Sequence, residues 1–335
     1  MRPLPALSLA LLLLSQSAEA AEPWYRRASC ESAARAVLSG DFKTADERLG
    51  RLEAQRDPDD QACAVWLHLL YAEIQLGLGG KLPALLENRD RRLKNIYGFS
   101  KAHAKYAARF ADLEIEARMK RVRFLAEDGK RSDALKEAKR SQALLELRLS
   151  KKAEPSITLD YSIGSSNLAV AFASWPVRMV IKLAGVSGDG ELGAKKLQEL
   201  YKGDTVYRYE AAYLLHSFAV ERPGDLLGSP VQYAAFLAAQ FPNNPQFLYE
   251  YAEALWVEKN CALAMQTLKP VQDVLAGEPG KWSSRIRGKI YLMSGRCALD
   301  LGQRDEARRF ADLARSQRVD EIEEKLEDLI SKLGS

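Results

Sequence analysis

A recurring turn signal constrains the fold of this chain more than any other feature of its sequence. The signal is a glycine followed five residues later by an alanine, and it occurs at Gly40/Ala45, Gly79/Ala84, Gly129/Ala134 and Gly302/Ala307. The pair Lys259/Ala264 keeps the alanine but has lysine in place of the glycine. Glycine allows a helix to end in a left-handed backbone conformation, and a small residue beyond the turn lets a second helix pack closely. The signal therefore predicts helical hairpins.

Helical periodicity between these turns predicts an all-α fold. In residues 60–78, for example, Trp66, Leu70 and Ile74 recur at helical spacing. Outside residues 177–183, no strand-like alternation persists in the sequence. We predict helices over residues 29–39, 42–54, 60–78, 82–93, 100–126, 132–150, 167–173, 177–184, 191–201, 204–221 and 320–333. We also predict a helix that begins at Pro230, and hairpins over residues 245–274 and 281–317.

The last two predicted hairpins have small and apolar residues at the signature positions of a known repeat. These residues are Ala252, Leu255, Ala264, Leu268, Gly295, Ala298, Gly302, Ala307 and Ala314. At these positions the chain resembles the tetratricopeptide repeat superfamily. The resemblance implies a degenerate, TPR-like solenoid of helical hairpins, wound as a right-handed superhelix, in which each hairpin packs on its neighbours.

Residues 174–193 carry a more particular likeness. Pro176 leads a predicted helix into a loop that contains Gly188, Asp189 and Gly190, and Gly193 follows. This arrangement resembles the tetratricopeptide repeat protein 39 family, and with its flanking helices the likeness covers residues 163–274. Because that family consists of helical-repeat proteins without an enzymatic signature, the resemblance implies a scaffold.

The first 20 residues have the features of a secretory signal peptide. Arg2 is basic, residues 4–14 are apolar, and Ala18-Glu19-Ala20 is a small-x-small cleavage site. The apolar run is shorter than the ~20 residues that span a membrane, so we expect no transmembrane segment. We expect cleavage after Ala20 and export to the periplasm.

The remaining chain divides into four predicted parts. Residues 21–152 form N-terminal helical hairpins, and residues 153–203 form a helical insert interrupted by proline and glycine. Residues 204–317 form the C-terminal TPR-like hairpins, and residues 318–335 form a capping helix. A repeat array can reach this length because each unit packs only on its neighbours.

The four cysteines are Cys30, Cys63, Cys261 and Cys297. An even number in an exported protein favours disulfides, and four cysteines allow three connectivities. Cys261 and Cys297 fall on segments that pack antiparallel in such arrays, so this pair is the more natural one. Cys30 with Cys63 is plausible but weaker, and four buried free thiols are the alternative. The sequence contains no CxxC pair or Cys/His cluster, so we expect no metal site.

Aromatic residues are concentrated in one part of the sequence. Residues 201–256 contain 12 of the 28 aromatic residues. Tyrosine offers both contact area and a polar tip, which suits a groove that binds peptide. The candidate partner-binding residues are Tyr207, Tyr209, Tyr213, Tyr249, Tyr251 and Trp256. Core packing is the alternative role for them, and Tyr249 and Tyr251 cannot share one helix face.

Two patterns that could indicate chemistry have simpler explanations. Gly188, Gly190 and Gly193 form a GxGxxG pattern, but the second strand of a dinucleotide site does not follow, so we expect a turn between helices and no cofactor. The three histidines are His68, His103 and His216, and they belong to no catalytic motif. We therefore predict that the protein is not an enzyme.

Charge is unevenly distributed over the chain. The formal net charge is only +4, but residues 89–152 contain 19 lysine and arginine residues and 9 aspartate and glutamate residues. Arg118, Lys120, Arg121 and Arg123 alternate with apolar residues, which favours a solvated surface over a site for an anionic partner. Export and the near-neutral net charge disfavour nucleic acid.

These observations favour an exported scaffold. Its concave helical groove would bind a protein or peptide partner without catalysis. One alternative is a carrier that holds a lipid or another apolar ligand between the helices of residues 168–184 and the aromatic hairpins. Another is an unrecognised hydrolase, which would need clustered ionisable groups in one cleft.

Overall fold

The structure is a computed structural model that describes residues 23–78, 107–127, 129–150, 156–172, 188–222, 224, 226–278 and 282–334. Every regular element in this part of the chain is a helix. The α-helices are α2 (Ala28–Leu38), α3 (Phe42–Ala54), α4 (Pro58–Gly77), α6 (Ala107–Glu127), α7 (Arg131–Ser150), α8 (Ile157–Phe172), α10 (Gly190–Lys202), α11 (Tyr207–Glu221), α12 (Pro230–Gln240), α13 (Pro245–Val257), α14 (Cys261–Gly277), α15 (Ser284–Asp300), α16 (Arg304–Ser316) and α17 (Glu323–Gly334). Two short 3-10 helices are η1 (Trp24–Arg26) and η3 (Asp320–Ile322). The all-α prediction is confirmed for these residues.

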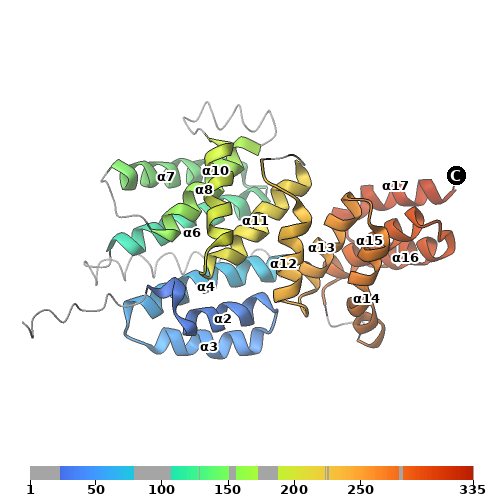
Figure 1. The fold of residues 1–335 in the computed structure, drawn as a ribbon, viewed down its shortest axis with the longest axis horizontal. Coiled ribbons are helices and arrows are strands. Elements are labelled where there is room, and N and C mark those ends of the chain that lie inside the picture. The colour runs from blue at the N-terminus through green and yellow to red at the C-terminus, as the bar shows by residue number, and fades with distance from the viewer. Residues whose placement is uncertain are drawn as a thin grey trace, which may run out of the picture.

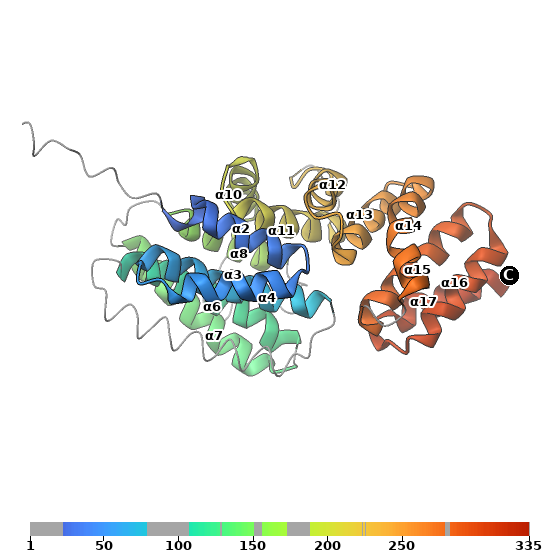
Figure 2. The same cartoon turned by 90° about the horizontal axis from the view of Figure 1, so that it is seen from below.

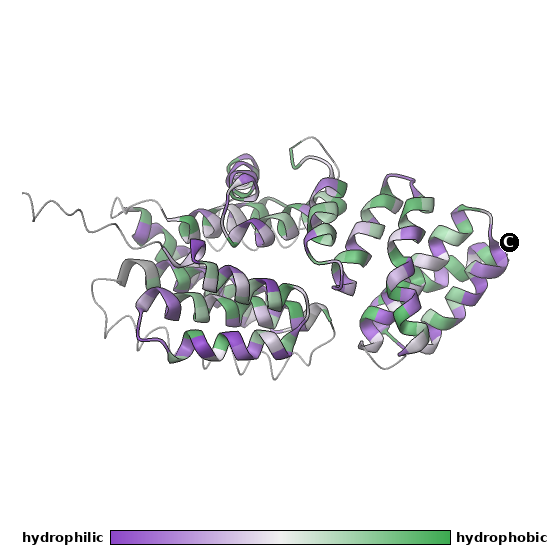
Figure 3. Cartoon of the chain, turned by 60° about the horizontal axis from the view of Figure 1, so that its bottom comes forward, coloured by the Kyte–Doolittle hydropathy of each residue, from purple (hydrophilic) through white to green (hydrophobic). Residues whose placement is uncertain are grey.

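The helices pack in neighbouring pairs: α2–α4 lie beside α6–α8, α10 and α11 in one half of the molecule, and α12 and α13 lead to α14–α17 in the other half (Figures 1 and 2). The helices carry hydrophobic residues on one side and hydrophilic residues on another (Figure 3). The predicted signal peptide and the predicted helices over residues 82–93 and 177–184 lie outside the described residues. None of the described helices combines the length and the hydropathy needed to cross a bilayer.

Four of the predicted hairpin turns adopt one conformation. The φ angles are 72° at Gly40, 73° at Gly129, 63° at Lys259 and 76° at Gly302. In each turn the amide of the following residue donates to the carbonyl five residues back, as Asp41 N does to Ala36 O at 3.1 Å. This double-bonded helix ending satisfies carbonyls that the helix itself leaves free. Lys259 therefore takes the place of a glycine in the same turn, at some conformational cost.

The alanine after each turn lies in the contact between the two helices of its hairpin. Ala45, Ala264 and Ala307 have no exposed surface, and Ala134 is 6% exposed. The hairpins are α2/α3, α6/α7, α13/α14 and α15/α16. The predicted pairing of a left-handed turn with a buried alanine is confirmed at Gly40, Gly129 and Gly302 and also at Lys259, whereas Gly79/Ala84 lies outside the described residues.

We call the helices from α2 to α12 the N-terminal region. One large core joins them except for α7, which packs on α6 and α8 through a small cluster of its own. The centre of the large core is aromatic, because the rings of Trp24, Trp66 and Tyr207 lie 5.6–5.7 Å from one another. A disulfide between Cys30 and Cys63 links α2 to α4 inside this core. Segments far apart in the sequence therefore share a single hydrophobic interior.

The helices from α13 to α17, which we call the C-terminal region, pack differently. One core cluster lies between α13, α14 and α15, and another between α15, α16 and α17. The contact of α15 with α17 depends on Gly295, since a Cβ there would lie 2.8 Å from Leu329 Cδ2. On α17, Leu326, Leu329 and Leu333 are buried, so this charged amphipathic helix covers the apolar face of the preceding hairpin.

The GxGxxG pattern is a feature of helix packing. A Cβ on Gly193 would lie 2.8 Å from Leu168 N, and one on Gly188 would lie 2.8 Å from Asn167 O. Asp189 caps α10 by accepting from Leu192 N at 3.0 Å. The glycines thus let α10 approach α8 closely, and α8 itself begins ten residues before the predicted start at Asn167.

Candidate binding groove

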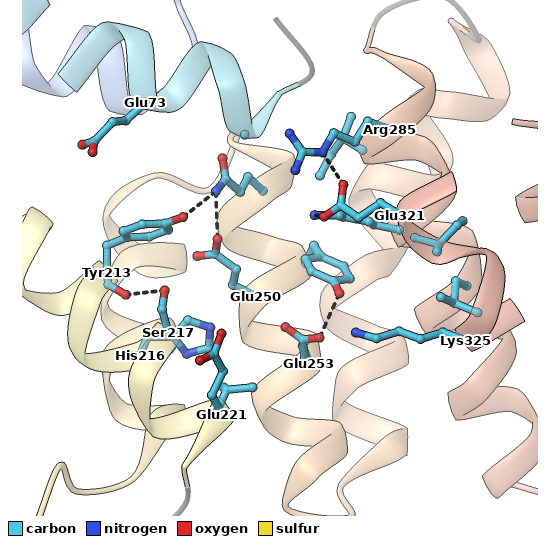
Figure 4. A pocket seen from close by; sticks show the side chains of 18 of the residues that line it. Glu73, Tyr213, His216, Ser217, Glu221, Glu250, Glu253, Arg285, Glu321 and Lys325 are labelled. Atoms are coloured by element: carbon cyan, nitrogen blue, oxygen red, sulfur yellow. Dashed lines mark hydrogen bonds and ion pairs between the residues drawn. The ribbon is translucent and has the colours of Figure 1, made fainter. Parts of the chain in front are cut away.

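A cavity of about 410 Å³ opens where the N-terminal region meets the C-terminal region. We call it the groove. Residues of α4, α6, α11 and α13 line one wall, and residues of α15, η3 and α17 line the other. Figure 4 shows side chains from both walls pointing into the space between them.

The two walls carry opposite net charges, although Arg123 lies on the first wall and Glu321 on the second. Glu73 of α4, Glu221 of α11, and Glu250 and Glu253 of α13 provide carboxyl groups on the first wall. Arg285 and Lys289 of α15 and Lys325 of α17 provide cations on the second. Because the helices come from distant parts of the chain, the sequence gives no direct sign of this arrangement.

Glu321 occupies two of the cations on the second wall. Its carboxylate accepts from Arg285 Nε and lies 2.6 Å from Lys289 Nζ. Partial burial alone would raise the pKa of Glu321, but the hydrogen bonds from Arg285 and Lys289 outweigh it and lower the pKa to about 2. Arg285 and Lys289 are therefore engaged within their own wall.

Glu250 on the opposite wall is only partly satisfied. Its Oε1 accepts from Gln246 Nε2 at 2.9 Å, whereas the buried Oε2 has no hydrogen-bond partner among the described residues. Glu250 is 8% exposed, and this burial raises its pKa to about 8; the Glu253 charge adds to the rise, and Gln246, Lys289 and Arg123 oppose it. At neutral pH the Glu250 carboxyl consequently holds a proton.

Two of the six candidate aromatic residues line the groove. The Tyr213 hydroxyl accepts from Gln246 Nε2 at 3.5 Å, and the Tyr249 hydroxyl donates to Glu253 Oε1 at 2.9 Å. Arg123 lies over the Tyr213 ring, with its guanidinium carbon 5.9 Å from the ring centroid. The tyrosine pair thus provides flat apolar surface between the charged groups.

The other four candidates lie elsewhere. Tyr207 and Tyr209 are 0% and 1% exposed, so the prediction that they form a binding wall is corrected; α11 directs both rings into the N-terminal core. Tyr251 packs against the core between α13 and α14. Trp256 lies on the far end of α13, where its Nε1 donates to Asp300 Oδ2 at 2.8 Å.

A buried charge cluster lies behind the groove. Lys120 Nζ is 2.7 Å from Glu210, 3.2 Å from Glu116 and 3.2 Å from Glu73, and Lys120 is 6% exposed. The expectation of a solvated surface is therefore wrong for Lys120. Burial raises the pKa of Glu116 to about 8, with Lys120 opposing the rise. Since Glu73 belongs to both sites, the cluster is continuous with the first wall of the groove.

The basic residues beside Lys120 are also engaged. Arg118 and Arg121 both pair with Glu137 of α7, and Arg121 does so at 3.0 Å. Lys120 is four residues from Glu116, a spacing that the sequence could have suggested as an ion pair. Its contact with Glu210, 90 residues away, has no such signal.

The histidines and the remaining cysteines occupy separate positions. His216 lines the groove, and its burial lowers its pKa; its Nδ1 is 3.3 Å from Pro230 O. His68 Nε2 is 2.8 Å from Glu53, and His103 lies outside the described residues. Cys261 and Cys297 are buried free thiols in mutual contact. The order of preference predicted for the two disulfides is thus reversed, because α2 and α4 bring Cys30 and Cys63 together.

A second cavity, of about 820 Å³, lies near the ends of α4 and α14 and is largely apolar, with Phe42, Leu248 and Trp282 among its lining residues. Among the described residues, no group of histidine, cysteine, aspartate and glutamate side chains could hold a metal ion.

Comparisons of the chain with protein-family models, with curated proteins and with solved structures find no match.

Proposed function

We propose that the protein is an exported, TPR-like scaffold that binds a segment of a partner protein in the groove, without catalysis. The observation that carries this proposal is the groove itself, with opposed charged walls and two tyrosines between them. A peptide segment has polar backbone groups and side chains along its whole length, so it can pair with the charged groups of both walls and pack against the tyrosines.

Two further features support parts of the proposal. The four identical turns with buried alanines are what a tetratricopeptide-like array requires. The disulfide between Cys30 and Cys63 is compatible with an oxidising compartment such as the periplasm. A repeat origin and export are therefore consistent with the packing and with the cysteine chemistry.

The groove offers less support for a lipid carrier, because charged groups dominate its lining. A hydrolase is the second candidate, and Glu250 is the observation that favours it. A buried carboxyl with a raised pKa in a cleft can act as a proton donor near neutral pH.

A peptide array would test the proposal. We expect the mature protein to bind a subset of 15-residue peptides, and the variants Glu253→Ala and Lys325→Ala to weaken that binding. The matched control is Lys136→Ala, because Lys136 is exposed on α7, outside the groove, and pairs with Asp133 of its own helix. If both groove variants bind the peptides as tightly as the wild-type protein does, the groove is not the binding site. Turnover of a chromogenic ester or glycoside, lost in Glu250→Gln, would favour the hydrolase.

A further inference from the structure

We infer that the first wall of the groove is an anchor for one cationic side chain of the bound segment, a lysine or an arginine, with Glu250 as its counter-ion. The inference rests on the proposed function and names the chemistry that the groove selects. It begins from an acceptor that the described structure leaves without a donor.

That acceptor is Glu250 Oε2. The residue is more than nine-tenths buried, and only Oε1 is engaged, by Gln246. A buried carboxyl oxygen without a hydrogen bond is costly, and most such atoms in proteins are satisfied. An ammonium or guanidinium group is the donor that compensates a carboxylate most strongly.

The charges around Glu250 favour a cation over an anion. Glu73, Glu221 and Glu253 contribute further carboxylates to the same wall. Of the two cations whose charges act on Glu250, Lys289 is held by Glu321 and Arg123 lies over the Tyr213 ring. Neither donates a hydrogen bond to Glu250 Oε2, so this oxygen can accept one from an incoming cation.

The shape and the surface of the groove suit a long basic side chain. The cavity of about 410 Å³ is large enough for the stem of lysine or arginine, and Tyr213 and Tyr249 lie beside it. The aliphatic stem can pack on these rings while the charged end reaches the carboxylates. A short or purely apolar side chain would leave Oε2 without a donor.

Binding of a cation would be coupled to proton release. Burial keeps the Glu250 carboxyl protonated near neutral pH, and a cation beside it stabilises the ionised form. The titratable and charged groups that line the groove with it come from seven elements: Glu73 of α4; Arg123 of α6; Tyr213, His216 and Glu221 of α11; Tyr249 and Glu253 of α13; Arg285 and Lys289 of α15; Glu321 of η3; and Lys325 of α17. Because the ionised form binds the cation, affinity should increase as pH rises from 6 toward about 8.

The test uses the full mature chain and two peptides, acetyl-Ala-Ala-Lys-Ala-Ala-amide and the same peptide with norleucine in place of lysine. Isothermal titration calorimetry at pH 7 in phosphate and in Tris gives both the affinity and the number of protons released, since the two buffers differ in ionisation enthalpy. We expect the lysine peptide to bind about tenfold more tightly, as a charge-assisted hydrogen bond allows, with protons released on binding.

Two variants make the test specific. Glu250→Gln keeps the shape of the protonated side chain and should abolish both the preference for lysine and the proton release. Asp305→Asn changes an exposed carboxylate on α16, outside the groove, and should keep both the preference for lysine and the proton release. A Glu250→Gln protein that still prefers lysine and releases protons would overturn the inference.

The remaining outcomes separate the two proposals. Equal binding of the lysine and norleucine peptides overturns the cation anchor and leaves the peptide groove standing. If neither peptide binds at millimolar concentration, while array peptides without basic residues do, the anchor is again overturned alone. If no peptide of either set binds, both the anchor and the proposed function are wrong.

Discussion

The N-terminal and C-terminal regions use the same helical hairpins but are held together in different ways. In the N-terminal region, polar contacts join distant residues: Arg35 donates to Tyr209 at 3.0 Å and to Gln240 at 3.1 Å, across 174 and 205 positions of sequence. Within the C-terminal region the side-chain contacts are shorter in range, as between Trp256 and Asp300, which are 44 positions apart. Its long-range contacts, such as that of Ser283 Oγ with Leu78 O, join it to the N-terminal region.

Because of this difference, the two regions should respond differently to a destabilising substitution. Long-range contacts must all form together, so the N-terminal region should unfold as one unit. Stacked hairpins gain stability from each neighbour in turn, so the C-terminal region should lose structure helix by helix. Four experiments test this difference between the two regions.

The largest effect is expected from Lys120→Ala. The substitution leaves Glu116, Glu210 and Glu73 in the core without their shared cation, and breaking a buried ion pair costs about 3–5 kcal/mol. Hydrogen exchange with mass spectrometry should show lost protection throughout α2–α12 and retained protection in α14–α17. The control is Lys136→Ala, which removes an exposed ion pair on α7. Equal loss in both regions would contradict the contrast.

Removal of the disulfide comes next. In the double variant Cys30→Ala, Cys63→Ala, the unfolded chain gains the freedom of a loop of 33 positions, which lowers the free energy of unfolding by roughly 3–4 kcal/mol. The matched variant Cys261→Ala, Cys297→Ala removes two buried thiols but no cross-link, so it should lower the free energy of unfolding by a smaller amount.

Urea unfolding with and without reductant would measure this difference. Reductant should lower the free energy of unfolding of the wild-type protein and leave that of the Cys30/Cys63 variant unchanged. Alkylation of the unfolded, unreduced protein should count two free thiols, and a count of four or none would be inconsistent with the structure.

The pH dependence of the two regions should have opposite signs. Glu321 has its pKa lowered from 4.5 to about 2, so its pairing stabilises the α15–α17 contact above pH 4.5 and is lost as the pH falls toward 2. Glu116 has its pKa raised from 4.5 to about 8, so the stability that its proton provides is full below pH 4.5 and is lost as the pH rises through 8.

Hydrogen exchange at pH 3 to 9, corrected for the intrinsic rate, would resolve these signs. Acid should expose α17 first, and alkali should expose α6 and α11. The Glu321 effect should stay below about 1 kcal/mol, because the side chain is partly exposed. Glu321→Gln should remove the acid response of α17, and a response that persists would assign it to another group.

The smallest effect is a gain of stability. Lys259→Gly relieves a left-handed conformation that costs an L-residue about 1–2 kcal/mol, and glycine's greater freedom in the unfolded chain offsets part of that gain. We expect the free energy of unfolding to rise by about 0.5–1 kcal/mol.

A control separates strain from the contact of Lys259 with Trp256, whose ring centroid is 5.6 Å from the ammonium. Lys259→Ala removes the ammonium and keeps the strained conformation, so it should bring no gain. If the glycine variant is no more stable than the alanine variant, the turn stores no strain.

Local features of the fold could be predicted from the sequence, whereas long-range ones could not. The left-handed turns and the buried alanines depend on residues five positions apart, and Ser229 before Pro230 marked the start of α12, where its hydroxyl accepts from Val231 N. Asp204 was predicted to cap α11, but that helix starts at Tyr207 with Val206 at its N-cap, and Asp204 pairs with Arg208 instead.

The candidate site shows the same limit. Tyr213 and Tyr249 could be chosen because aromatic residues cluster in their part of the sequence, but the same reasoning selected Tyr207 and Tyr209, which are core residues. Glu250 had no distinguishing signal, because its burial depends on how α13 meets α4 and α15. The sequence does not distinguish a buried glutamate from an exposed one in the same helix, because burial depends on how the helices pack.

The hydrogen bond from Asn244 Nδ2 to Leu38 O, at 2.6 Å, has a consequence for the newly made chain. The two residues are 206 positions apart, so α2 cannot complete its contacts until α13 has left the ribosome. At 5–20 residues per second this delay is about 10–40 s. Throughout it, aromatic residues such as Trp66 lack their final neighbours, and the nascent chain has to be kept from aggregating. The C-terminal hairpins, by contrast, can close almost as soon as they emerge.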